Sequence, residues 1–296
     1  MQMYRREHYL AKLRPFYDDV GLIKVVTGIR RCGKSSLLCS VMDELRERGV
    51  AEGNICYINL DRREYQGVNT PEKLDAVIEH SLGKSASTRY LFIDEIQNVK
   101  GYEAIVNGWR EEGDCSIFIT GSNSYLLSGE LATKLTGRYI ELEMFTLSFS
   151  EYLGMREYLG LPQKPESQIF QEYLTYGGFP KALEYEDLDA KAMYIQDVIG
   201  QIFNKDIAAR KVVRHRDTFQ RVQDYLINNY AAPTNLSGIV DYLKHGEGVT
   251  VKRELCPAVG ECEGPLQMPA IRFAFAQVVE RRGEVLSCGS WHTIRT

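Results

Sequence analysis

The sequence predicts an α/β fold in which a parallel β-sheet is covered by helices on both faces. Along the first half of the chain, short apolar segments typical of buried strands alternate with segments whose apolar residues recur at helical spacing. A glycine-rich motif, G-x-x-x-x-G-K-S at residues 28–35, stands between the first strand and the first helix. Alternating strands and helices form parallel sheets, which bind ligands at the carboxyl ends of their strands.

Each element of this first half is marked by its own local pattern. The apolar runs predict strands at residues 23–27, 54–60, 90–93, 115–120 and 140–142. Helical spacing predicts helices at residues 35–48, 71–82 and 102–112, and Pro71 suits the first turn of the second of these. We interpret residues 1–147 as one domain built on this sheet.

The second half changes character at residue 148. Residues 148–212 contain no strand-like run, so we expect a helical subdomain broken at residues 160–162 and 177–180. Residues 213–254 hold two helical patterns and a turn at 245–248, which predict a helix-turn-helix or winged-helix-like segment and a contact with DNA or a protein partner. Residues 255–296 have no sustained period, and we interpret them as an irregular tail, disordered or produced by a shifted reading frame.

Composition limits the function classes. The 296 residues are 44% hydrophobic, and the net charge of −4 gives no global signal for nucleic acid or membrane surfaces. No apolar run reaches the roughly 18 residues that a membrane span needs, and residues 1–14 are too charged for a secretory signal. The seven cysteines form no C-x-x-C pair. We therefore expect a cytoplasmic protein with reduced thiols and no membrane partner.

The glycine-rich motif predicts a nucleotide site. Glycines let successive backbone N–H groups turn toward a phosphate, and the following helix N-terminus favours negative charge. Lys34 is expected to reach the β- and γ-phosphates, and the Ser35 hydroxyl is expected to bind Mg²⁺. A glycine turn without a ligand is the alternative. The nucleotide-binding candidates are Gly28, Ile29, Arg30, Arg31, Cys32, Gly33, Lys34, Ser35 and Ser36.

Two adjacent carboxylates follow the third predicted strand. Asp94 is expected to hold Mg²⁺ together with Ser35, and Glu95 is expected to orient or deprotonate the attacking water. Such a pair is also common as solvated or helix-capping residues. Beside a complete phosphate loop, the functional interpretation is favoured. Glu95 argues against a small-molecule kinase, which must keep water away from the γ-phosphate, and the chain lacks the N-K-x-D motif of small G proteins.

Three further residues are candidates for the catalytic machinery. Ser122 and Asn123 follow the fourth predicted strand and are placed to contact the γ-phosphate or its water, although Gly-Ser-Asn also forms simple turns. Arg138 precedes the fifth strand and is a candidate arginine finger, with an ordinary surface arginine as the alternative.

Together these motifs resemble the AAA-type P-loop ATPases, and more closely a bacterial and archaeal family with an AAA domain followed by a C-terminal domain of unknown function. The resemblance covers roughly residues 1–250. It implies the AAA-type sheet order, a nucleotide site at a subunit boundary, and a homo-oligomer in which Arg138 acts in trans. It rests on residues 27–38, 91–97, 120–124, 135–139, 147–152 and 176–180.

Two functions follow from these residues. The first is an Mg²⁺-dependent ATPase that binds ATP and couples its hydrolysis to a conformational change. The alternative is a slowly hydrolysing, nucleotide-gated switch or binding module that recruits DNA or a protein through residues 213–254.

Overall fold

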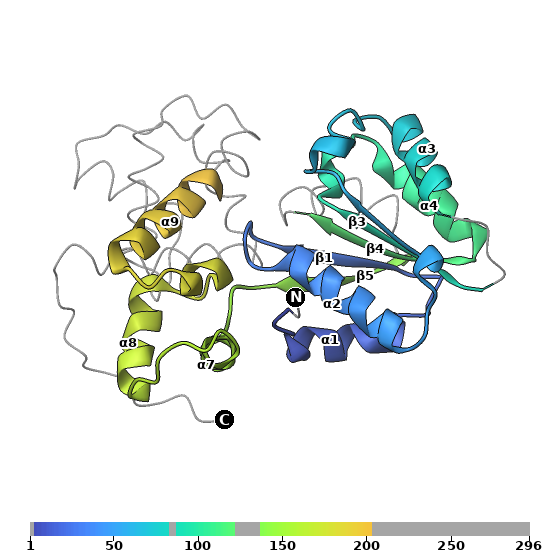
Figure 1. Cartoon of the computed structure of the whole chain (residues 1–296). Coiled ribbons are helices and arrows are strands. Elements are labelled where there is room, and N and C mark those ends of the chain that lie inside the picture. Colours follow the sequence, from blue (N-terminus) through green and yellow to red (C-terminus); the bar gives the residue numbers. More distant parts are fainter. Residues whose placement is uncertain (1–2, 83–86, 122–136, 203–296) are drawn as a thin grey trace, which may run out of the picture. The chain divides into compact units, whose positions relative to one another are not determined.

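The computed structural model describes residues 3–82, 87–121 and 137–202, and these form parts of two compact units (Figure 1). The first unit runs to Pro162 and includes Gly178–Glu186, whereas the second contains Gln163–Gly177 and continues from Asp187. The predicted helical segment that starts at residue 148 is therefore divided between the two units. Residues 213–254 and 255–296, for which we predict a helix-turn-helix-like segment and a tail, lie outside the described residues.

A parallel five-stranded sheet in the order β2-β3-β4-β1-β5 is the centre of the first unit. The predicted α/β fold is confirmed, and each predicted strand is present with boundaries within two residues. The strands are β1 (Ile23–Gly28), β2 (Ile55–Asn59), β3 (Arg89–Asp94), β4 (Cys115–Gly121) and β5 (Tyr139–Met144).

The burial of the strands explains this order. Every residue of β1, β3 and β4 is buried, whereas β2 and β5 carry partly exposed positions. Strands buried on both faces are continuous apolar runs, and such runs occupy the middle of a parallel sheet. The partly exposed strands β2 and β5 form its two edges.

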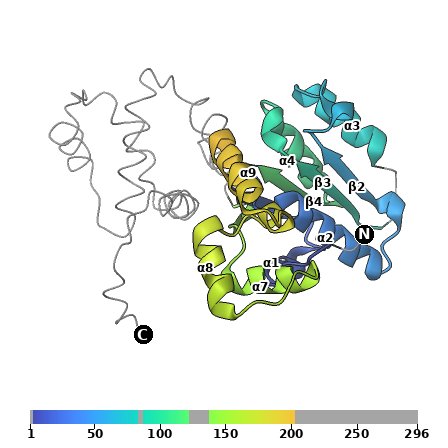
Figure 2. The ribbon, with the colours of Figure 1, turned by 60° about the vertical axis from the view of Figure 1, so that its left-hand side comes forward.

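Helices cover both faces of the sheet. Helices α3 and α4 lie on one face, and α1 and α2 lie on the other (Figures 1 and 2). Among the described residues, the helices of this unit are α1 (Glu7–Leu13), α2 (Lys34–Glu47), α3 (Pro71–Ser81), α4 (Tyr102–Glu112) and α7 (Phe149–Tyr158). Short 3₁₀ turns occur at η1 (Arg14–Phe16), η2 (Glu52–Asn54), η3 (Arg63–Tyr65), η4 (Ile96–Asn98) and η5 (Pro180–Glu184). None of the helices within the described ranges has the length and apolar character to cross a bilayer.

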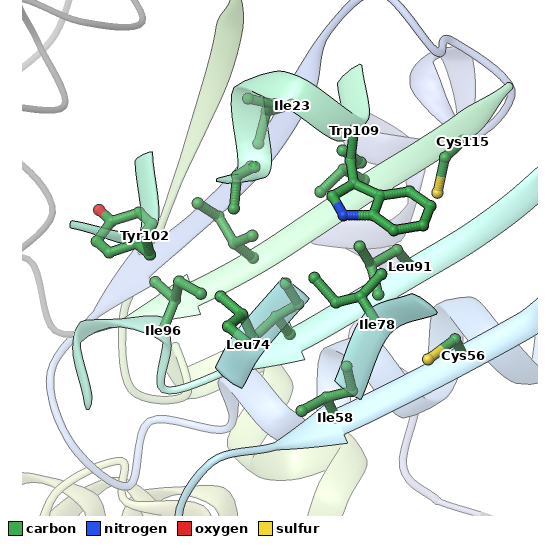
Figure 3. Close-up of a cluster of buried hydrophobic side chains, with 14 of the residues drawn as sticks. Ile23, Cys56, Ile58, Leu74, Ile78, Leu91, Ile96, Tyr102, Trp109 and Cys115 are labelled. Atoms are coloured by element: carbon green, nitrogen blue, oxygen red, sulfur yellow. The ribbon is translucent and has the colours of Figure 1, made fainter. Parts of the chain in front are cut away.

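The two faces have separate apolar cores. Under α3 and α4, Leu74, Ile78 and Trp109 pack on the strand residues Ile58 and Leu91 (Figure 3). On the opposite face, Phe92 stacks on Phe118 with ring centroids 4.7 Å apart, and side chains from α1 and α2 cover the pair. Helix α1, which we did not predict, contributes to this second core.

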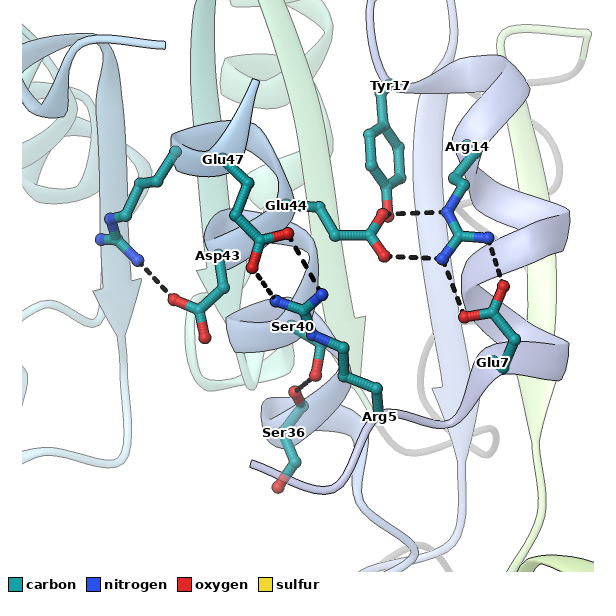
Figure 4. Close-up of polar contacts among 10 residues, drawn as sticks. Arg5, Glu7, Arg14, Tyr17, Ser36, Ser40, Asp43, Glu44 and Glu47 are labelled. Carbon is teal, nitrogen blue, oxygen red and sulfur yellow. Dashed lines mark hydrogen bonds and ion pairs between the residues drawn. The ribbon is translucent and has the colours of Figure 1, made fainter. Parts of the chain in front are cut away.

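Ion pairs attach the N-terminal segment to helix α2 (Figure 4). Arg14 bridges Glu7 on α1 and the buried Glu44 on α2, and the Tyr17 hydroxyl donates a hydrogen bond of 3.0 Å to Glu44. The hydrogen bonds from Arg14 lower the pKa of Glu44 despite the opposing effect of burial. Because α2 begins in the phosphate loop, this segment packs against the helix that carries the loop.

Two sequence motifs that are distant along the chain meet beside α7. The Leu147 N–H donates a hydrogen bond of 2.7 Å to the Gly178 carbonyl. Ser148 caps α7 in a capping box with Glu151. Phe179, which follows Gly178, is fully buried. The G-G-F-P motif at residues 177–180 therefore anchors the segment that returns to the first unit.

In the second unit, α8 (Glu166–Tyr176) and α9 (Leu188–Gln201) are joined by a buried charge cluster. Glu172 on α8 accepts hydrogen bonds from Lys191 on α9 and from Lys164. Burial alone would raise the pKa of Glu172, but the two lysines outweigh it and lower the pKa to about 2. A buried pair of this kind is costly to break, because the remaining partner stays charged and desolvated.

We expect Gly178→Ala to destabilise the first unit. A Cβ atom at residue 178 would lie 2.2 Å from the Leu147 carbonyl oxygen, so the backbone must shift at a cost of about 1–3 kcal/mol. Gly67→Ala is the matched control, because a Cβ there meets nothing within 4 Å. Thermal unfolding measures both variants, and equal melting temperatures would contradict the close packing of Gly178 on Leu147.

We expect Glu172→Gln to destabilise the second unit by about 3–5 kcal/mol at neutral pH, since it leaves Lys191 buried without its counter-charge. The low pKa stabilises the folded protein above the unfolded-state pKa of about 4.3, and this contribution is lost as the pH falls toward about 2. Urea unfolding followed by circular dichroism from pH 7 to pH 3 should show this dependence in the wild type and less of it in the variant. Glu184→Gln, which removes an exposed pair with Lys181, is the control.

Candidate nucleotide-binding site

The glycine-rich motif forms the connection between β1 and α2. A Cβ at Gly28 would lie 2.3 Å from the Met144 carbonyl oxygen and 2.9 Å from Cys32 Sγ, so only glycine fits there. Arg31 has a φ of 66° and Gly33 a φ of 109°, both in the left-handed region. Two such residues reverse the chain within a few positions and direct it into the first turn of α2.

The lysine of the motif is buried on the loop itself. Lys34 is 4% exposed, and its Nζ donates hydrogen bonds of 3.0 Å to the Gly28 carbonyl and 3.2 Å to the Ile29 carbonyl. These bonds place the ammonium group at the start of the loop, beside the end of β1. Ser35 and Ser36 follow in the first turn of α2, where Ser35 is partly buried and Ser36 is exposed.

Asp94 is held at the end of β3 by three donors. It is fully buried; the Thr120 hydroxyl bonds to its Oδ1, while the Tyr57 hydroxyl and the Asn59 amide bond to its Oδ2 at 3.0 Å and 3.1 Å. Burial, followed by the charge of Asp94, raises the pKa of Tyr57, so this hydroxyl keeps its proton. The carboxylate is therefore fixed in position at the carboxyl edge of the sheet.

Glu95 occupies a strained backbone conformation next to it. Its φ of 58° and ψ of 47° are left-handed, which costs a non-glycine residue about 1–2 kcal/mol. The Glu95 N–H donates a hydrogen bond of 3.1 Å to the Thr120 hydroxyl, and the Gln97 amide bonds to the Glu95 carboxylate. The Thr120 hydroxyl thus contacts both acidic residues.

The sheet order brings these parts together. Strand β4 lies between β1 and β3, and the register pairs Val26 with Thr120 and Ile93 with Ile119. The loop after β1 and the carboxylates at the end of β3 therefore flank the end of β4. Ser122 and Asn123, the candidates that follow β4, lie outside the described residues.

Sequence reasoning missed the residues that hold Asp94. We did not single out Tyr57, Asn59 or Thr120, although Tyr57 and Asn59 alternate along β2 and so share one face of the sheet. That alternation at the end of a predicted strand was the available signal. The contact of these side chains with Asp94 follows only from the sheet register, in which Asn59 of β2 pairs with Asp94 of β3.

The structure places Arg138 away from these residues. It precedes β5, and its carbonyl accepts a hydrogen bond from the N–H of Ile23 at the start of β1. The phosphate loop follows the opposite end of β1, roughly 20 Å away at about 3.3 Å per residue. The side chain is 45% exposed and donates to Asn107 at 3.3 Å. Arg138 therefore lies near the amino ends of the strands, whereas the phosphate loop of its own chain lies at their carboxyl ends.

Two observations bear on ligand chemistry. Within the described ranges, no group of three or more His, Cys, Asp or Glu side chains is arranged to hold a metal ion. The oxygen donors Ser35 and Asp94 instead fit Mg²⁺, which retains several waters and binds few protein groups alongside phosphates. Cys32 is fully buried, and burial raises the pKa of its thiol, so it packs as a small apolar residue of the loop.

Comparison with known families agrees with this geometry. Residues 21–153 match an AAA domain family, and residues 167–254 match a domain of unknown function. An uncharacterised protein of Haemophilus influenzae is 38% identical over 241 residues, which are 81% of this chain and 60% of that protein. An uncharacterised protein of Methanocaldococcus jannaschii is 29% identical over 228 residues, which are 75% of this chain and 50% of that protein. The chain thus spans only part of the length of these relatives.

A solved structure shows the same fold. A Walker-type ATPase of Pyrococcus abyssi aligns with a TM-score of 0.58 and 17% sequence identity, covering 93% of this chain and 96% of that one. At this identity the likeness concerns the fold. Together with the family match and the phosphate-loop geometry, it shows that the chain belongs to the AAA-type P-loop ATPases, with an AAA domain followed by a domain of unknown function.

Proposed function

We propose that the protein binds ATP with Mg²⁺ and hydrolyses it to ADP and phosphate. The observation that carries this proposal is the arrangement of charge at one edge of the sheet. The buried Lys34 lies on a glycine loop after β1, and the fixed carboxylate of Asp94 lies at the end of β3. A cationic loop and a buried carboxylate in this relation suit a phosphate group and its metal ion.

Ser35 and Asp94 are the residues proposed to hold Mg²⁺. These two side chains would hold the ion, which would supply positive charge against the phosphate groups of the nucleotide. Three hydrogen-bond donors keep Asp94 oriented, and its burial removes competing water. Lys34 is proposed to exchange its bonds to the loop carbonyls for phosphate oxygens.

Glu95 is the proposed general base. It accepts a proton from water while the water oxygen attacks the γ-phosphorus, and the bond from that phosphorus to the bridging oxygen breaks to release ADP. Its left-handed backbone ends the extended conformation of β3, and the hydrogen bond from Gln97 orients the carboxylate. This role gives a reason for maintaining backbone strain at residue 95.

Arg138 is proposed to act in trans, at the nucleotide of a neighbouring copy. Arg138 lies at the amino ends of the strands, which prevents it from reaching the phosphate loop of its own chain at the carboxyl ends. Its side chain is about half exposed. A homo-oligomer with the nucleotide site at the subunit boundary would bring it to a γ-phosphate.

We expect Glu95→Gln to bind ATP normally but to hydrolyse it about a hundredfold more slowly or worse, because a positioned base is lost. Lys34→Ala should instead weaken nucleotide binding. Glu112→Gln, which changes an exposed carboxylate at the end of α4, should leave both nucleotide affinity and hydrolysis unchanged. Phosphate release measures hydrolysis, and titration with a fluorescent nucleotide measures affinity. Normal turnover in Glu95→Gln would remove Glu95 from the mechanism.

We expect Arg138→Ala to retain ATP affinity and lose turnover, since the arginine would act only on the transition-state charge of a neighbouring site. Mixing it with Glu95→Gln tests the trans arrangement. Each variant is inactive alone, but a mixed assembly contains interfaces at which one subunit supplies Glu95 and the other supplies Arg138. Partial recovery of hydrolysis on mixing is the expected result; undiminished turnover by Arg138→Ala, or no recovery, would contradict it.

A further inference from the structure

Arg6, just before α1, is a buried arginine whose three side-chain nitrogens all donate hydrogen bonds. The residue is 6% exposed, and its guanidinium also lies over the Tyr9 ring at 4.5 Å from the centroid. Its acceptors are the carbonyls of Cys32 (3.1 Å), Phe145 (2.7 Å) and Thr146 (3.1 Å) and the carboxylate of Glu151 (2.9 and 2.6 Å). One side chain therefore connects four parts of the first unit.

Three of these four acceptors relate the phosphate loop to the exit of β5. Cys32 belongs to the loop, and Phe145 and Thr146 follow the last residue of β5. The start of the loop already contacts this strand end, because Gly28 packs against the Met144 carbonyl. Arg6 makes a second connection at the other end of the loop. The loop is thus linked to residues 144–146 at two points, directly at Gly28 and through Arg6 at Cys32.

The fourth acceptor lies on α7. Glu151 completes the capping box of that helix through the Ser148 N–H, at 2.9 Å, while its two oxygens receive Arg6. Burial opposes ionisation of Glu151, but the hydrogen bonds from Arg6 and from Ser148 lower its pKa overall. A shift of α7 would therefore pull on the guanidinium that holds the Cys32 carbonyl.

We propose that Arg6 is a positioning residue for nucleotide binding, which holds the phosphate loop in its phosphate-accepting shape and couples that shape to helix α7. This inference rests on the proposed ATP-binding function. The planar fork of arginine suits the task, since it offers donors in several fixed directions at once. A lysine would keep the charge opposite Glu151 but present a single nitrogen, so it cannot bridge the loop, the strand exit and α7 together.

Hydrogen exchange on the nucleotide-free protein tests the positioning directly. In Arg6→Lys, amides of residues 28–36 should exchange roughly tenfold faster, the change expected when one hydrogen bond to a charged donor is lost. Glu151→Gln keeps Arg6 but weakens its anchor, and should produce a smaller increase at the same amides. Arg14→Gln is the matched control, because it removes two ion pairs of the same N-terminal segment and Arg14 has no hydrogen bond to the loop.

Nucleotide titration supplies the second readout. The Kd for ATP should rise about tenfold in Arg6→Lys and stay within about twofold in Arg14→Gln, even if the two variants lose similar thermal stability. Unchanged loop exchange or unchanged ATP affinity in folded Arg6→Lys would overturn the proposal, as would equal effects in Arg14→Gln. Should Arg6→Lys fail to fold, Glu151→Gln decides by the same two measurements. If the wild type itself does not bind ATP, the proposed function fails, whereas the exchange experiment still tests the role of Arg6.

Discussion

The contact between Gly28 and the Met144 carbonyl is the constraint on which the site depends. No side chain fits between the first residue of the loop and the end of β5, so the last residue of β1 must be glycine. The chain turns immediately after it. This close approach requires β1 and β5 to be neighbours in parallel register, from Ile23 with Tyr139 to Gly28 with Met144. The conformation of the loop is therefore a consequence of the sheet as much as of its own glycines.

The same sheet explains how separate polar residues become one site. Strand β4 separates the loop strand from the carboxylate strand, and its Thr120 hydroxyl contacts both Asp94 and the backbone of Glu95. On the other side of the carboxylate strand β3, β2 supplies the Tyr57 and Asn59 donors to Asp94. Desolvating a carboxylate is costly unless donors satisfy it, and here the neighbouring strands provide them. The buried carboxylate thus has hydrogen-bond donors from both neighbouring strands.

The N-terminal segment is part of the nucleotide domain rather than an appendage. Its apolar residues Leu10 and Leu13 complete the core under α2, and Arg14 pairs with the buried Glu44 of that helix. Arg6 extends the attachment to the loop and to α7. This connection explains why the first unit continues past β5, which ends at Met144, as far as Pro162.

The sequence by itself determined the elements and the chemistry of the main motifs. Largely apolar runs marked β1, β3 and β4, because strands buried on both faces carry few polar side chains. The spacing of Gly28, Gly33 and Lys34 marked the turn between β1 and α2. Tertiary structure alone decided which distant residues meet: Asn59 with Asp94, Arg6 with Cys32 and Glu151, and Leu147 with Gly178. Local propensity acts over a few residues, whereas these contacts depend on strand order and on hydrogen bonds between segments far apart in the chain.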